Sequence, residues 1–240
     1  MPVFNEQDAI AEVVEDFSKV LDQFEKPEFI IVNDKSTDKT LSVLENLRLK
    51  YPYLRVIDQL KNMGHGPTLM RAFLEAKGEY VFHCDSDNQF SAHDFWSVWN
   101  KFKEENCDVV IGFRKERNDP LVRLLLTRFL RLFLLIFFRV WFLDSNCPFR
   151  LYHRKALDQI LKLLPEKALI PSILMAIAAH KLSFKIGWIS VQHKPRLTGK
   201  SLIRGWKIFN LCLPAVREVF DFREQFESIS NRHEEKKIQP

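Results

Sequence analysis

The sequence predicts an α/β fold with a mostly parallel sheet flanked by helices. Short apolar, β-branched runs alternate with stretches of helical periodicity over about the first 110 residues, which is the pattern of a parallel sheet covered on both faces. Polar turns follow the predicted strands, at the ends where such a sheet opens its ligand crevice. At 240 residues, the chain is long enough for one such domain with an appendage.

The chain opens at Pro2–Glu6, which looks like the exit of a strand, although no strand precedes it. We therefore expect the first strand to be missing and the true translation start to lie upstream. An amphipathic helix is expected over 10–24, because its apolar residues recur at helical spacing. Residues 28–33 predict a strand, and a polar turn over 34–38 leads into the next helix, over 41–47.

A weak strand is predicted over 54–57, and a loop containing glycines leads from it into a helix from about 67 to 77. The apolar run that begins at Tyr80 predicts a buried strand, which ends abruptly in carboxylates. A helix is expected around 95–102, and residues 108–112 predict another buried strand.

The segment 121–143 is apolar but interrupted by arginines, and its longest uncharged run is far shorter than the roughly 20 residues that cross a bilayer. We therefore expect no transmembrane helix. The stretch from Gly112 to Arg139 carries seven basic and two acidic residues. Its excess of five positive charges equals the net charge of the whole chain, +5. Arg128, Arg131 and Arg139 share one side of a helical wheel, which favours an amphipathic helix lying in a membrane interface. A core helix with snorkelling arginines is the alternative.

The last part of the chain predicts a strand over 184–191 and then a basic loop that contains Gly199. An amphipathic helix is expected over 202–220. We therefore expect one domain over 1–220, followed by a charged tail, 221–240, that is solvated and poorly ordered.

Four widely spaced cysteines, without paired histidines, indicate neither a disulfide framework nor a zinc site, so a reducing compartment fits best. No signal peptide directs the chain out of the cytoplasm. The local excess of basic residues implies an anionic partner: phosphate, lipid headgroup or nucleic acid. Nucleic acid is the weakest of these, because the basic residues are interleaved with an apolar helix and no reader motif occurs.

The carboxylates that end the central strand are the strongest candidate site. Asp85 and Asp87 are one residue apart, and Asn88 adds an amide oxygen. This set of hard oxygen ligands suits Mg²⁺ or Mn²⁺ bridging a diphosphate better than it suits Zn²⁺. A solvated turn is the alternative, because Asp-Ser-Asp-Asn is also good turn composition.

Five short motifs occur in order along nearly the whole chain. They are Pro2–Glu6, Val32–Asp38, Asn62–Gly64, Asp85–Gln89 and Arg196-x-x-Gly199-x-Ser201. Together they resemble the family-2 glycosyltransferases of the GT-A fold, and among these they are most similar to the dolichol-phosphate mannose or glucose synthases and their bacterial polyprenyl-phosphate relatives. The arginine-rich segment 112–123 and the segment 144–150 are also similar, and they favour the branch with lipid-phosphate acceptors.

The resemblance implies a role for each matching position. The divalent cation would be held by Asp85, Asp87 and Gln89. The nucleotide sugar would be bound by Pro2, Val3, Asn5, Glu6, Asp34, Asn62, Asp85 and Ser86. The catalytic residues would be Asp87, Arg117 and Arg196. Phosphate and acceptor would be bound by Arg114, Arg123, Lys200 and Ser201.

Structural roles are the alternatives for several of these residues. Asp34 is also suited to forming a turn or capping a helix, and each arginine to a surface ion pair. The chain departs from the family pattern at Lys35 and Pro148, which replace glycines, and at Leu202, which replaces a lysine. The change at Leu202 puts one phosphate contact in doubt.

We therefore expect a metal-dependent, inverting transferase that moves a hexose from a nucleotide diphosphate sugar to a polyprenyl phosphate. It would lie peripherally at the cytoplasmic face of the membrane. The first alternative is a family-2 transferase that uses a saccharide acceptor in cell-surface polysaccharide synthesis. The second is a catalytically silent binder of nucleotide sugars.

Overall fold

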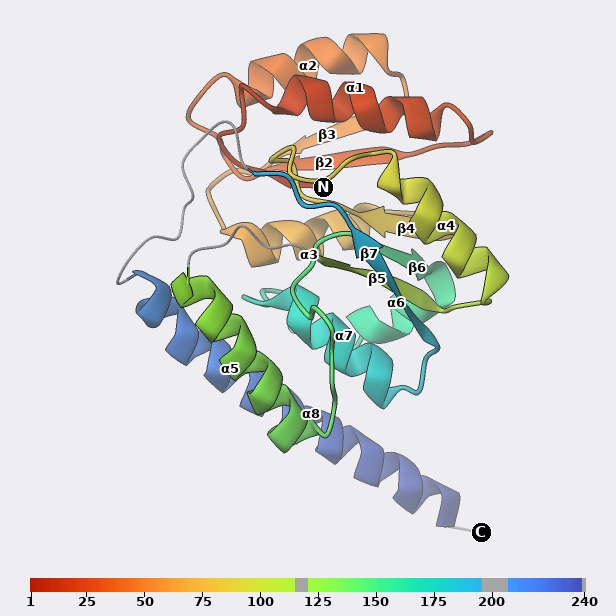
Figure 1. Ribbon diagram of the computed structural model, residues 1–240, viewed down its shortest axis with the longest axis vertical. Helices are drawn as coiled ribbons and strands as arrows, with labels where there is room; N and C mark the ends of the chain where they lie inside the picture. The colour runs from red at the N-terminus through yellow and green to blue at the C-terminus, as the bar shows by residue number, and fades with distance from the viewer. Residues whose placement is uncertain (115–120, 196–206, 239–240) are drawn as a thin grey trace.

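The computed structural model describes the backbone of residues 1–114, 121–195 and 207–238, and the side chains of these residues except 121–126, 207–212 and 229–238. It confirms an α/β fold in which helices cover both faces of the sheets (Figure 1). Two sheets lie next to each other, and Figure 1 marks the amino-terminus between them.

The first sheet is parallel throughout. Its strands are β1 (Pro2–Val3), β2 (Phe29–Asn33) and β3 (Leu54–Asp58), in the order β1-β2-β3. Pro2 lies beside Val32 and Val3 beside Asn33. The first strand, which the sequence led us to expect as missing, is therefore present as the two residues of β1.

Three helices sandwich this sheet: α1 (Ile10–Leu21), α2 (Thr40–Lys50) and α3 (His65–Glu75). Figure 1 shows α1 and α2 over one face and α3 on the other. The helical periodicity of α1 brings Ile10, Val14 and Phe17 onto one buried side, because residues three and four apart share a face. On α3, Leu69 and Phe73 are buried in the same way.

The second sheet is mixed. Its strands are β4 (Tyr80–His83), β5 (Val109–Arg114), β6 (Arg150–His153) and β7 (Ile186–Val191), in the order β4-β6-β5-β7. β6 runs antiparallel to both β4 and β5, whereas β5 and β7 are parallel. The sequence analysis did not identify β6 as a strand, because its four residues include Arg150 and His153 and show no apolar run.

Arg150, the first residue of β6, is fully buried between β4 and β5. Its guanidinium donates hydrogen bonds to three main-chain carbonyls: those of Cys147 at 2.7 Å, Ser172 at 2.6 Å and Ser145 at 2.6 Å. Because a buried cation is stable only when its donors are satisfied, Arg150 fixes the loop before β6 against the helix that contains Ser172.

The second sheet is covered by α4 (Asp94–Glu104), α6 (Arg154–Leu161) and α7 (Pro171–Lys181). Residues Pro171–Ala179 of α7 are all buried. The loop before α7 comes so close to α3 that a Cβ on Gly66 would lie 2.1 Å from the carbonyl oxygen of Ala168. Only glycine fits at this contact, which connects the two halves of the fold.

The helices α5 (Leu121–Phe138) and α8 (Lys207–Ile238) lie side by side at one end of the molecule (Figure 1). Phe133 and Phe137 of α5 pack against Phe220 of α8, with ring centroids 5.5 and 5.2 Å apart. α5 is shorter than expected, because Arg139 adopts a left-handed conformation with φ of 56°. Arg139 therefore leaves the helical stripe predicted from the sequence.

The charged segment that was expected to be a poorly ordered tail continues α8 as helix. Phe222 is buried in the core, and Arg223 pairs with Glu227 one turn further on, at 2.8 Å. Buried contacts and pairs four residues apart both stabilise helices, which accounts for the difference. Among the described helices, none is long and apolar enough to cross a membrane.

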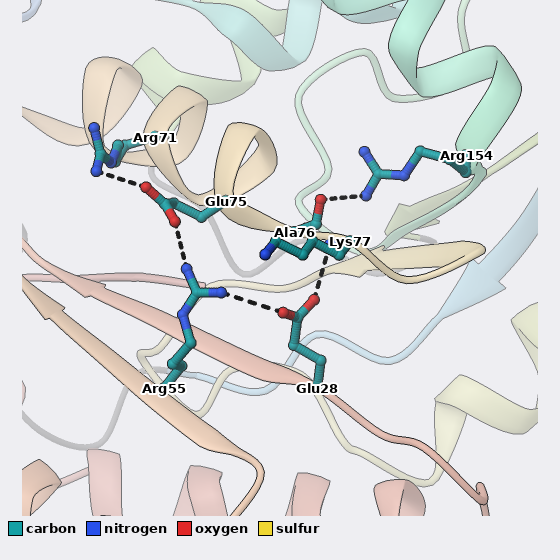
Figure 2. Close-up of polar contacts among 7 residues, drawn as sticks. All are labelled: Glu28, Arg55, Arg71, Glu75, Ala76, Lys77 and Arg154. Carbon is teal, nitrogen blue, oxygen red and sulfur yellow. Dashed lines mark hydrogen bonds and ion pairs between the residues drawn. The ribbon is translucent and has the colours of Figure 1, made fainter.

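A polar network ties the first sheet to the connection between α3 and β4 (Figure 2). Arg55 on β3 contacts both Glu28 and Glu75, and Glu75 also pairs with Arg71. Glu28 in turn accepts a hydrogen bond from the main-chain N–H of Lys77 at 2.9 Å. The carboxyl end of α3 is thereby held against the start of β2.

We expect Arg150→Met to lower the free energy of unfolding by about 3 kcal/mol or more, because three buried carbonyls lose their donor. Urea denaturation measures this change. Arg48→Met is the matched control, since Arg48 is half exposed in a pair three residues apart, and it should change stability by about 0.5 kcal/mol at most. Equal losses in the two variants would contradict the organising role of Arg150.

Candidate active site

A pocket of about 280 Å³ opens at the carboxyl ends of β1, β2 and β4. It brings together side chains from four separate parts of the sequence. Of the predicted site residues, those that line it are Pro2, Val3, Glu6, Asp34, Asn62, Asp85, Ser86 and Asp87. The pocket thus lies where a parallel sheet places its ligands.

Asp85 holds an unsatisfied oxygen in this pocket. Its Oδ1 atom is buried without a hydrogen-bond partner, 3.6 Å from Nε2 of His83 and 4.0 Å from Nε2 of His65. Burial alone would raise the pKa of the Asp85 carboxyl, but the imidazoles of His65 and His83 outweigh burial and lower that pKa to about 2. Asp85 is therefore ionised at neutral pH.

His83 lies beneath Asp85 and is almost completely buried. Neither of its ring nitrogens has a hydrogen-bond partner. Burial lowers the pKa of His83 to about 4, so the imidazole is neutral at neutral pH. A neutral ring thus lies 3.6 Å from the ionised carboxylate of Asp85, whose charge stays available to a cationic ligand.

The donor chemistry of Asp85 and Asp87 fits Mg²⁺ or Mn²⁺. No group of three His, Cys, Asp or Glu side chains in the described parts of the chain is close enough to enclose a metal by itself. Mg²⁺ is commonly bound by one or two carboxylates together with substrate phosphates, so two carboxylates are sufficient for a cation shared with a diphosphate. The unsatisfied oxygen of Asp85 is the observation that supports this fit.

Gln89, the third predicted metal ligand, connects two loops. Its Nε2 donates to the carbonyl of Lys194 at 3.0 Å, and its main-chain N–H donates to Oδ1 of Asp87 at 3.3 Å. Gln89 thus joins the segment containing Asp87 to the chain that follows β7. Its role as a metal ligand stays a prediction.

Asp34 shapes the loop between β3 and α3. Its carboxylate accepts from the main-chain N–H of Met63 at 2.7 Å and of Gly64 at 2.9 Å, and from Nε2 of Gln59 at 2.9 Å. The side chain of Asn62 donates to the carbonyl of Asp34 at 3.0 Å. Binding of a base by Asp34 stays a prediction, and the contacts seen here hold the loop that carries His65.

Asn5 and Lys35 are each adjacent in sequence to residues that line the pocket. Asn5 adopts φ of 54°, and its Oδ1 accepts from the main-chain N–H of Thr37 at 2.8 Å. The neighbouring Glu6 donates its N–H to Oγ1 of Thr40 at 2.9 Å. Lys35 adopts φ of 58°, a left-handed conformation that glycine takes without strain, which explains why a glycine suits this position in the family.

Arg114 lies at the end of β5, and its guanidinium contacts both oxygens of Asp144, at 2.8 and 3.1 Å. Both side chains are largely buried. The role of Arg114 in binding phosphate stays a prediction. The side chain of Arg123 lies outside the described residues. The same holds for Arg117, Arg196, Lys200, Ser201 and Leu202, whose roles stay predictions.

The sequence analysis missed His65 and Thr68, which also line the pocket. They lie three residues apart in the first turn of α3, and therefore on one side of the helix. Thr68 accepts from Nε2 of Gln59 at 2.8 Å. The sequence feature that could have indicated them is a pair of polar residues three positions apart at the start of a helix that follows Gly64.

The chain belongs to the glycosyl transferase family 2, whose family model matches residues 1–161. Fold, pocket and carboxylates agree with this membership.

Curated relatives cover different parts of the chain. A poly(ribitol-phosphate) beta-glucosyltransferase of Bacillus spizizenii is 35% identical over 49% of this chain and 19% of its own length. A dolichyl-phosphate beta-glucosyltransferase of Trichomonas vaginalis is 28% identical over 65% of this chain and 51% of its own. A dodecaprenyl-phosphate galacturonate synthase of Rhizobium johnstonii is 25% identical over 93% and 66%. The chain therefore spans about half or less of the first two relatives.

Among solved structures, the chain is similar to glucosyl-3-phosphoglycerate synthase from Mycobacterium tuberculosis in complex with Mn²⁺ and uridine-diphosphate-glucose. The TM-score is 0.64 at 19% identity, over 92% of this chain and 76% of the other. This likeness shows that the two proteins share a fold, which is of the GT-A type.

We expect Asp34→Asn to lower the free energy of unfolding by about 2 kcal/mol, because an amide nitrogen would face N–H donors that the carboxylate now accepts. Urea denaturation of parent and variant measures the loss. Asp16→Asn is the control, since Asp16 pairs with Lys19 on the exposed side of α1, and it should change stability by less than about 1 kcal/mol. A fully stable Asp34→Asn variant would show that the loop does not depend on this carboxylate.

Proposed function

We propose that this chain is a metal-dependent glycosyltransferase that moves a hexose from a nucleotide diphosphate sugar to a polyprenyl phosphate at the cytoplasmic face of a membrane. The observation that carries the proposal is the pocket at the strand ends, in which Asp85 presents an unsatisfied carboxylate oxygen one residue from Asp87. The family membership supplies the reaction class. The relatives whose names include dolichyl-phosphate and dodecaprenyl-phosphate support the lipid-phosphate acceptor.

In the proposed reaction, an oxygen of the acceptor phosphate forms a bond to the anomeric carbon of the sugar. The bond from that carbon to the donor diphosphate breaks, and the nucleoside diphosphate leaves with the electron pair. A divalent cation held by Asp85 and Asp87 would neutralise the charge of the leaving diphosphate. An acceptor phosphate is already an anion, so the chain needs no general base for this step. Positioning and charge stabilisation are what the pocket supplies.

The acceptor proposal also rests on an exposed apolar surface of α5. Phe129, Leu132 and Ile136 are 64%, 52% and 62% exposed and recur along one side of the helix, while Phe133 faces α8. Beyond the helix end, Trp141 is 56% exposed under the guanidinium of Arg131, 5.4 Å from its ring centroid. Contiguous exposed apolar side chains flanked by arginines suit the interface of an anionic membrane.

The cytoplasmic side is supported by the cysteines. Cys84, Cys107 and Cys147 are free and buried. Free thiols are typical of reducing compartments.

A saccharide acceptor is the second candidate. The similarity to a poly(ribitol-phosphate) beta-glucosyltransferase favours it over the part of the chain that this relative covers. The two candidate functions share the donor pocket and differ in the acceptor, so the identity of the glycosylated product distinguishes them.

The function is tested by incubating the protein with a panel of radiolabelled nucleotide diphosphate sugars, Mg²⁺ or Mn²⁺, and either polyprenyl phosphate or soluble saccharides. We expect label in the organic extract only with polyprenyl phosphate. Asp87→Asn should reduce transfer about 100-fold or more, because the cation loses a charged ligand. Excess chelator should do the same to the parent.

Asp8→Asn is the matched control, because Asp8 is exposed in the turn before α1 and lies outside the pocket. It should transfer at the parental rate, and both variants should melt at the parental temperature. Full activity of Asp87→Asn with chelator present would refute the metal assignment. If only the saccharide becomes labelled, the proposal of a lipid-phosphate acceptor is refuted and the saccharide acceptor is supported.

The membrane contact is tested by co-sedimentation with anionic vesicles. We expect the double variant Phe129→Ser, Ile136→Ser to lower the bound fraction several-fold, because two exposed apolar side chains no longer enter the interface. Salt should release the parent only in part, since it screens the arginines but not the apolar contact.

Leu49→Ser with Leu60→Ser provides the control, because these leucines are 84% and 97% exposed but lie on the first half of the fold, away from α5. This pair should leave vesicle binding unchanged. Equal sedimentation of the two double variants would show that α5 is not the membrane contact.

A further inference from the structure

Beneath the pocket, His83 and Asp85 bring two unsatisfied polar atoms close together. The residues are two positions apart where β4 ends, a spacing that places side chains on one side of a strand. Nε2 of His83 and Oδ1 of Asp85 are both buried without a hydrogen-bond partner, 3.6 Å apart. A shift of about 0.6 Å would bring them to the usual distance of an N–H···O hydrogen bond.

The imidazole ring of His83 is held in place by its surroundings. The ring of Phe73 on α3 meets it edge to face, with ring centroids 5.4 Å apart. His83 also lies opposite Arg150 in the ladder of β4 and β6, and the guanidinium of Arg150 is bonded to main-chain carbonyls. His83 is almost completely buried, whereas the side chain of Asp85 is 28% exposed. Asp85 is therefore the partner with room to adjust.

The contact with Asp85 selects one tautomer of His83. Burial lowers the pKa of His83 to about 4, and the charge of Arg150 acts in the same direction, so the ring is neutral at neutral pH. A neutral imidazole carries a proton on one nitrogen and a lone pair on the other. A lone pair on Nε2 would face the negative carboxylate, whereas an N–H there would donate to it. The proton therefore belongs on Nε2.

A hydrogen bond from His83 leaves Asp85 free to bind a cation. An ionised carboxylate has about four lone-pair positions on its two oxygens, and His83 would use one of them. Carboxylates that bind metals are themselves commonly hydrogen-bonded by a neighbouring group, which fixes their orientation. His83 is well placed to be that neighbour of Asp85.

A histidine at this position is costly for the fold. Both of its ring nitrogens are buried without a hydrogen-bond partner, and unsatisfied buried polar atoms lower stability. An apolar side chain of similar size would avoid this cost. A buried unsatisfied group next to a binding site therefore indicates a role other than packing.

We propose that His83 is a positioning residue for the cation site: its Nε2–H donates to Oδ1 of Asp85 and holds this carboxylate in the orientation that binds the divalent cation. His83 is not among the residues that line the pocket, so it acts through Asp85. The inference rests on the proposed function, because it concerns the cation that the donor diphosphate would share.

The first test measures Mn²⁺ binding by the whole protein, from the loss of the electron paramagnetic resonance signal of free Mn²⁺. We expect His83→Leu to bind at least about tenfold more weakly than the parent, the loss that is typical when a metal-binding residue is deprived of its hydrogen-bonding neighbour. His83→Leu should nevertheless melt at or above the parental temperature, because it removes two unsatisfied buried atoms. His83→Gln should bind about as tightly as the parent, since its amide N–H can replace that of Nε2.

His153→Leu is the matched control. His153 lies at the end of β6, and its Nδ1 accepts from the main-chain N–H of Lys155 at 3.1 Å at the start of α6. This variant should lower the melting temperature, because the helix loses its cap, and it should leave Mn²⁺ binding unchanged. The two leucine variants thus separate stability from cation affinity.

The second test locates the proton on His83 in the parent. Proton–nitrogen correlation spectra of the imidazole distinguish the two neutral tautomers, and His83→Gln identifies the signals of His83 by their loss. We expect the proton on Nε2 at neutral pH. A proton on Nδ1 would overturn the inference, even if His83→Leu does not fold.

Equal Mn²⁺ affinity of the parent and His83→Leu would also overturn the inference, while the proposed function would stand. A parent that binds no Mn²⁺ would overturn the inference together with the cation of the proposed function. Both readouts are independent of sugar transfer, so the two failures are distinguishable.

Discussion

The buried guanidinium of Arg150 is the constraint around which the second half of the fold is arranged. A cation in the core needs every donor satisfied, and here the partners are carbonyls of Ser145, Cys147 and Ser172. They lie in the loop before β6 and at the start of α7, so satisfying Arg150 fixes both. Arg150 also pairs in register with His83, which places β4, and hence Asp85, relative to this loop. The position of a carboxylate in the pocket thus depends on hydrogen bonds made beneath it.

Several polar groups near the pocket are satisfied by the protein itself, whereas Asp85 and the adjacent His83 keep buried atoms without a hydrogen-bond partner. Asp34 has its carboxylate engaged by the loop after β3, and Arg114 is paired with Asp144. Asp85 differs, because one oxygen is buried without a hydrogen bond. Since unsatisfied buried charge is costly, a site that keeps it is suited to a cation that supplies the missing interaction. Residues whose polar atoms are already hydrogen-bonded within the protein build the pocket, whereas pocket residues with an unsatisfied polar atom are available to a ligand.

An apolar surface remains open in the described structure on the side of α5 that bears Phe129 and Ile136. The guanidinium of Arg131 lies beside it, over the ring of Trp141. Exposed apolar side chains next to a basic group suit a broad anionic interface.

The sequence by itself determined the α/β class, the alternation of elements through β5, and the placing of Asp85 and Asp87 at a strand end, because these follow from local periodicity and from the point where an apolar run stops. It did not reveal β6, which is four residues long and is a strand only because β4 and β5 flank it. Nor did it separate the roles of Asp34 and Arg114, whose partners lie 29 and 30 positions away along the chain at Met63 and Asp144. His65 lines the pocket together with residues from distant segments of the chain, and the helix continues beyond Asp221, where Phe222 is buried and Arg223 pairs with Glu227. Local chemistry therefore fixed most of the elements, whereas long-range contacts made β6 a strand and decided which side chains are free to act.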